Sequence, residues 1–186
     1  MRSFVRPLAL LAMLCGIPSG HNQAETVAEH ELKAIFLYNF ANYIAWPESA
    51  FKKRQSPFNY CLLGESRINT SLKTVAANET VKGRALRVLE LDDTEQLSDC
   101  HILFVHQRQD GYPSGLMRQL AAESVLTVGD GEAFIPSGGT IGLLKKERRI
   151  DLLINMEAIE LGQLKVSSKL LRLAKRVRLS RETPEP

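Results

Sequence analysis

Two cysteines carry the most definite chemistry that this sequence offers. Cys61 lies in an apolar segment at residues 58–63, and Cys100 stands directly before another at residues 101–106. If these segments are neighbouring strands, the two sulfur atoms can meet, and an oxidising compartment allows them to form a disulfide. Such a disulfide could have a purely structural role. Alternatively, both cysteines could be unpaired buried thiols.

The other reactive side chains do not form an arrangement typical of an enzyme. His101 and His106 bracket an apolar segment, where histidines are more often structural than ligands. No H-x-x-x-H or C-x-x-C spacing indicates a metal, and no G-x-S-x-G motif indicates a nucleophile. Gly129-x-Gly131 follows a predicted strand, but Phe134 occupies the place of the third glycine of a dinucleotide motif. We therefore expect no enzymatic activity and no metal or cofactor.

An aromatic segment at residues 31–47, ELKAIFLYNFANYIAWP, is the strongest helix signal. It contains five of the twelve Phe, Tyr and Trp residues. A spacing of three or four predicts one apolar helical face, and Pro47 predicts that the helix stops near Ala45. The helix is expected to pack in the core, with Tyr43 and Trp46 as candidates for a docking face or pocket. The predicted face consists of Leu32, Ile35, Phe36, Phe40, Tyr43 and Trp46.

Two further segments are candidates for binding. A last helix, capped by a serine at 167 or 168, is predicted to carry the apolar line Leu170, Leu173, Ala174 and Val177. Its basic side is either an ordinary solvated face or a surface for phosphate or carboxylate groups, and its candidate residues are Lys169, Arg172 and Arg176. Open α/β sheets bind ligands at the carboxyl ends of their strands. The strand-end candidates are Gly129, Asp130 and Phe134.

The first 24 residues are predicted to be a cleaved export signal. Arg2 and Arg6 precede a short apolar run at residues 8–15, which is too short to span a membrane. These residues hold two of the 24 basic residues and none of the 21 acidic ones, so the mature chain is nearly neutral. A nucleic-acid partner is therefore not expected. The rest suits one domain at residues 25–181, followed by a frayed tail at 182–186.

The order of the elements predicts the fold class. Strands are expected at residues 58–63, 85–91, 101–106, 124–128, 140–144 and 150–155, with helices between most of them. This alternation predicts a single three-layer α/β domain with a mostly parallel sheet and helices on both faces. The short link at residues 145–149 predicts an antiparallel pair at the sheet edge.

The chain resembles the YfiR-like family of bacterial periplasmic proteins. The resemblance rests on motifs that cover most of the mature chain, among them KAIFLYNFANYIAWP (33–47), YCLLG (60–64), CHILFV (100–105), VLTVGDGEAF (125–134) and GGTIGLL (138–144). It implies a periplasmic inhibitor that binds the periplasmic domain of a YfiN-like membrane diguanylate cyclase and so lowers cyclic-di-GMP and biofilm formation. It also implies a YfiB-like outer-membrane lipoprotein that relieves the inhibition, and a homodimer.

The resemblance also bears on the cysteines. It implies a disulfide between Cys61 and Cys100 and an inhibitor that responds to redox state. Some members of the family have a second cysteine pair, but Ile135 and Gly142 occupy those positions here. The alternative function is a periplasmic receptor for a small ligand such as a nucleotide or an amino acid, suggested by the α/β layout and the basic segment.

Overall fold

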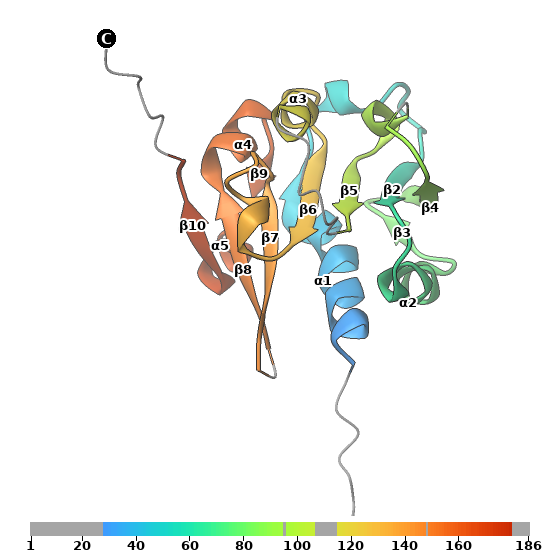
Figure 1. Ribbon diagram of the computed structural model, residues 1–186. Helices are drawn as coiled ribbons and strands as arrows, with labels where there is room; N and C mark the ends of the chain where they lie inside the picture. The colour runs from blue at the N-terminus through green and yellow to red at the C-terminus, as the bar shows by residue number, and fades with distance from the viewer. Residues whose placement is uncertain (1–27, 95, 107–114, 148, 180–186) are drawn as a thin grey trace, which may run out of the picture.

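The computed structural model describes residues 28–94, 96–106, 115–147 and 149–179, which form a mixed β-sheet with helices on both faces (Figure 1). The predicted export signal and the predicted frayed tail lie outside the described residues. Across the sheet the strand order is β10-β8-β7-β6-β5-β2-β4-β3. The strands are β2 (Phe58–Leu63), β3 (Thr80–Val81), β4 (Arg84–Leu91), β5 (Ile102–Val105), β6 (Leu126–Asp130), β7 (Ile141–Lys146), β8 (Arg149–Asn155) and β10 (Ala174–Val177).

The centre of this sheet is parallel. β4, β2, β5, β6 and β7 run in the same direction, whereas β8 is antiparallel to β7 and β3 is antiparallel to β4. Every residue of β5 is buried, as expected for a strand covered by helices on both faces. The predicted α/β class, with a mostly parallel sheet and an antiparallel pair toward its edge, is confirmed.

Helices cover the two faces of the sheet through separate apolar clusters. On one face, α1, α2 and α5 belong to one apolar cluster that includes alternate residues of β2 such as Tyr60 and Leu62. On the other face, α3 and two short 3-10 turns pack against Cys61 and Leu63. The helical elements are α1 (Glu29–Tyr43), η1 (Glu48–Ala50), α2 (Arg67–Ala76), η2 (Leu97–Asp99), α3 (Leu116–Ala122), η3 (Glu132–Phe134), α4 (Met156–Leu161) and α5 (Ser168–Leu173).

The predicted apolar face of α1 was wrong in part. The side of the helix that is fully buried carries Ala34, Leu37, Phe40 and Ala41, whereas Ile35 is 42% exposed. Small alanines let the helix backbone approach the sheet closely, Phe40 fills the contact with Leu37, and Phe36, Tyr38 and Tyr43 are only partly buried beside it. The helix also ends at Tyr43, two residues earlier than predicted, because β1 (Ile44–Ala45) pairs with β9 (Lys165–Val166) in a separate antiparallel ladder.

The last helix is shorter than predicted. α5 ends at Leu173, and Ala174–Val177 form the outermost strand β10, which lies parallel to β8. The helical spacing of Leu170, Leu173, Ala174 and Val177 favoured a longer helix. Pairing with the free edge of β8 overrides that local preference and places the last two in a strand. Leu173 is 63% exposed as a result. None of the helices in the described residues has the length and apolar character needed to cross a membrane.

Candidate functional site

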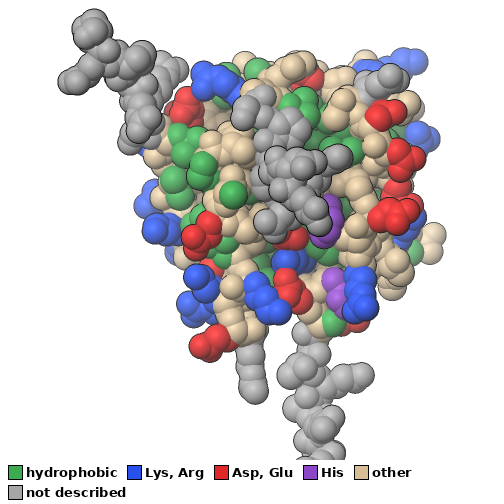
Figure 2. Space-filling view, in the orientation of Figure 1, with side chains coloured by type: hydrophobic (Ala, Val, Ile, Leu, Met, Phe, Trp, Pro, Cys, Tyr) green, Lys and Arg blue, Asp and Glu red, His purple; other side chains and the backbone are tan. Residues whose placement is uncertain are grey.

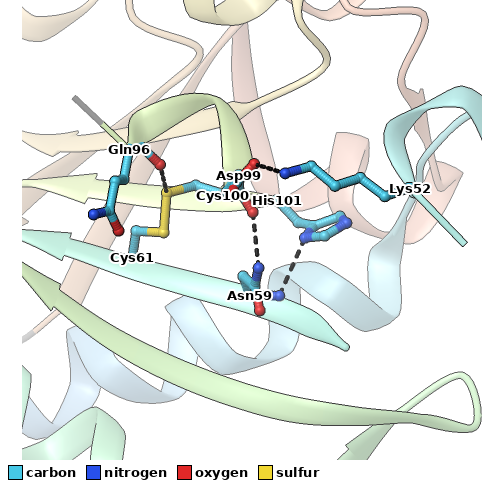
Figure 3. Close-up of a disulfide and its surroundings, with 7 residues drawn as sticks. All are labelled: Lys52, Asn59, Cys61, Gln96, Asp99, Cys100 and His101. Atoms are coloured by element: carbon cyan, nitrogen blue, oxygen red, sulfur yellow. Dashed lines mark hydrogen bonds and ion pairs between the residues drawn. A yellow bond between two sulfur atoms is a disulfide. The ribbon is translucent and has the colours of Figure 1, made fainter. Parts of the chain in front are cut away.

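The disulfide joins β2 to the residue that precedes β5. Cys61 and Cys100 are bonded, and their Cα atoms are 5.7 Å apart (Figure 3). Both residues are buried in the apolar cluster that α3 covers. Because neither sulfur is accessible at the surface, a reductant reaches the bond only when the structure opens locally.

Hydrogen bonds around the disulfide connect the same two segments. The Asn59 backbone N–H donates to His101 Nδ1 at 3.1 Å, and the His101 backbone N–H donates to the Asn59 carbonyl at 2.9 Å. The Asn59 side chain also donates to the Asp99 carbonyl at 2.8 Å, and Lys52 pairs with the Asp99 carboxylate at 2.5 Å (Figure 3). These contacts hold β2 beside β5 independently of the sulfur bond.

His101 is a structural residue inside an aromatic stack. Its ring lies 4.5 Å from the Phe51 ring and 4.7 Å from the Phe58 ring, and the Arg84 guanidinium lies 3.8 Å from the Phe51 centroid. Burial, followed by the positive charge of Arg84, lowers the pKa of His101 to about 4. The ring is therefore neutral at pH 7, with Nδ1 free to accept the bond from Asn59.

The two aromatic candidates lie in different environments. The Trp46 ring packs edge-on against Phe58 at 4.9 Å, and its Nε1–H donates to the Ser124 carbonyl at 3.0 Å. Tyr43 lies where α1 meets α5, with the Lys169 ammonium 5.4 Å from its ring centroid. Trp46 thus mainly closes the core, whereas Tyr43 and Lys169 form one partly exposed cation–π pair.

The strand-end candidates do not form an open ligand site. The Phe134 ring is completely buried between Gly129 and Gly139. A Cβ atom at either glycine would lie 2.3 Å from that ring, so both positions exclude a larger residue in this arrangement. Phe134 therefore packs in the core of this structure, and a role as a ligand contact stays a prediction.

Asp130 belongs to an ion-pair network that ties α1 to the sheet. Lys33, which is only 7% exposed, lies 2.8 Å from Asp130 and 2.6 Å from Glu29, and Glu29 lies 2.7 Å from Lys145. Burial by itself lowers the pKa of Lys33, but the hydrogen bonds to Asp130 and Glu29 outweigh it and raise the pKa above its ordinary value. Lys145, then Lys33, lowers the pKa of Glu29. The sequence analysis missed this network, although Glu29 and Lys33 have the four-residue spacing of a helical ion pair.

The basic candidates do not share one helical face. Lys169 and Arg172 lie on α5, whereas Arg176 lies on β10, because the helix ends between them. Arg172 and Arg176 are exposed, and neither has an ion pair with a described residue. Arg178, just beyond β10, differs because it pairs with Glu160 at 2.6 Å. The structure thus places most of this charge at one edge of the sheet.

No group of His, Cys, Asp and Glu side chains in the described residues is arranged to hold a metal ion. The family comparison is more informative than any such cluster. The model of the YfiR/HmsC-like family matches residues 30–175. This chain belongs to the YfiR/HmsC-like family. The match begins in α1 and ends in β10, so it includes the disulfide, the Lys33–Asp130 ion pair and part of the basic edge. A comparison with curated proteins finds no match.

Proposed function

We propose that this YfiR/HmsC-like protein is a periplasmic regulatory binding protein that represses a membrane diguanylate cyclase. It acts by contacting the periplasmic domain of a YfiN-like enzyme and so lowers cyclic-di-GMP and biofilm formation. The observation that carries the proposal is the family match over residues 30–175. A YfiB-like outer-membrane lipoprotein is the proposed antagonist, and the working form is proposed to be a homodimer.

The described surface is compatible with such a contact role. The strand-end residues that could have formed a ligand crevice are used for packing and ion pairing, as shown by Phe134 and Asp130. Exposed basic and apolar side chains lie instead around α5 and β10. For this reason we favour a protein partner over the alternative of a receptor for a nucleotide or an amino acid.

Deletion of the gene in its own host tests the proposal. Cellular cyclic-di-GMP and surface attachment are expected to rise in the deletion strain. Expression of the full chain is expected to lower both to the level of the wild-type strain. The matched control expresses residues 25–186 without the predicted export signal, which should not restore repression. Unchanged cyclic-di-GMP after deletion, in a host that carries a YfiN-like cyclase, would refute the proposal. Restoration by the control would refute the periplasmic part.

A further inference from the structure

β10 is an open edge of the sheet. It is hydrogen-bonded to β8 on one side, and its other side forms no backbone hydrogen bond with a described residue (Figure 1). The outward N–H and C=O groups of such a strand can pair with another extended chain. At the opposite end of the sheet, β3 is only two residues long and pairs with Arg84 and Ala85, so the rest of β4 has no strand partner on that side among the described residues either.

The charge at this edge selects the kind of chain that can pair with it. Lys175 and Arg176 are exposed and have no ion pair with a described residue, and Arg172 lies just before them on α5. Like charges placed opposite each other destabilise paired strands. A second copy of β10 would bring Lys175 and Arg176 against the same residues of its partner, so self-pairing is disfavoured. Glu and Asp side chains are favoured opposite this strand.

A cavity lined by leucines and charged residues adjoins the same edge. It has a volume of about 560 Å³ and is lined by Leu144, Leu153 and the exposed Leu173, together with Lys175. Two acidic residues also line it: Asp151 pairs with Arg149 at 2.9 Å, and Glu132 lies 3.9 Å from Lys146. Figure 2 shows basic and hydrophobic side chains, with a few acidic ones among them, along the side of the molecule where Figure 1 places β10.

We propose that β10 binds an extended acidic segment of a partner protein as an added strand. Side chains alternate between the two faces of a strand, so every second residue of the added segment faces the cavity. Lys175 lines the cavity, and Arg176, the next residue of the strand, lies on the opposite face. The segment that fits carries Glu or Asp residues on the face of Arg176 and apolar residues that enter the cavity beside Leu153, Leu173 and Lys175. The inference rests on the proposed function only for the identity of the partner, because the edge, the charge and the cavity belong to this chain.

The test uses the mature, disulfide-bonded protein and a synthetic peptide of alternating glutamate and valine. Fluorescence anisotropy measures binding, and hydrogen exchange locates it. The peptide is expected to bind, to slow amide exchange in β10 but not in β3, and to bind more weakly as salt is raised. A peptide of the same sequence with alternate backbone nitrogens methylated is expected to lose at least tenfold in affinity. Equal binding by the two peptides would overturn the inference, since it would show adsorption by charge alone.

Charge reversal gives a second readout. The double variant Lys175→Glu and Arg176→Glu is expected to lose the glutamate peptide and to gain binding of an alternating lysine and valine peptide. The matched control Lys53→Glu and Arg54→Glu makes the same change of net charge on an exposed loop and should keep the original preference. Absence of binding by the wild type, or equal effects of both variants, would overturn the inference. Peptide binding with unchanged cyclic-di-GMP after gene deletion would refute the proposed function and leave this site standing.

Discussion

Removal of the disulfide is expected to weaken the protein strongly without changing its fold. The double variant Cys61→Ala and Cys100→Ala releases a bond that closes a loop with a sequence separation of 39. In the loop-entropy model, the lost constraint on the unfolded chain lowers the free energy of unfolding by about 4 kcal/mol. For a domain of this size, that loss corresponds to a fall of roughly 10 °C in Tm.

The folded state should nevertheless persist, because β2 and β5 remain in contact without the bridge. They pair in parallel, and Asn59 makes three hydrogen bonds to Asp99 and His101 beside the missing bond. The near-UV circular dichroism spectrum and the slow amide exchange of β2 and β5 are expected to stay close to those of the oxidised protein.

Urea unfolding of three samples measures the effect: the oxidised wild type, the reduced wild type and the double alanine variant. The reduced protein and the variant should unfold at similar urea concentrations, well below that of the oxidised protein. A loss of less than about 1 kcal/mol would refute the loop argument. Loss of amide protection in β2 and β5 under native conditions would refute the conclusion that the hydrogen bonds suffice, and would support a bridge that switches the structure.

Three further predictions concern single sites. As pH falls from 6.5 to 4, His101 becomes protonated in the unfolded chain but stays neutral in the folded chain, so the free energy of unfolding should fall by about 2 kcal/mol. In urea titrations, His101→Gln should flatten this part of the dependence of stability on pH. An unchanged slope in the variant would contradict a buried neutral ring. Lys33→Met should cost about 3 kcal/mol in the same assay because it removes the buried cation that pairs with both Asp130 and Glu29. Lys145→Met, at an exposed pair, should cost less than about 1 kcal/mol. Equal losses would show that burial of the cation is not what matters. A Cβ atom at Gly142 would lie 3.3 Å from Ile135 Cγ1, so the double variant Ile135→Cys and Gly142→Cys should form a second disulfide. A thiol assay on the denatured protein should then find no free thiol. Two free thiols in aerated protein would contradict the closeness of positions 135 and 142.

The central strands could be predicted from the sequence because their signals are local. Residues 58–63 and the strands after them are short apolar runs bounded by turn residues, and their order in the chain sets a parallel sheet. The end of the chain could not be predicted in this way. Leu173, Ala174 and Val177 fit a helix over one turn, and only pairing with the free edge of β8 places Ala174 and Val177 in a strand.

The candidate site shows the same division. The predicted strands placed Cys61 and Cys100 so that they could meet if those strands were neighbours, and the family resemblance implied the pairing that the structure contains. The roles of Asp130 and Phe134 depended on partners that no local pattern supplies. Lys33 reaches Asp130 from a helix 97 positions earlier in the chain. The Phe134 ring lies between Gly129, which is in β6, and Gly139, which precedes β7.

The packing of Phe134 links the evolution of three positions. Gly129 and Gly139 leave no space for a methyl group while the ring is present, and the ring would leave a cavity if it were replaced alone. An alanine at either glycine can therefore spread through a lineage only together with a smaller side chain at 134. Related sequences should therefore change at positions 129, 134 and 139 together, so that the summed volume of the three side chains stays nearly constant.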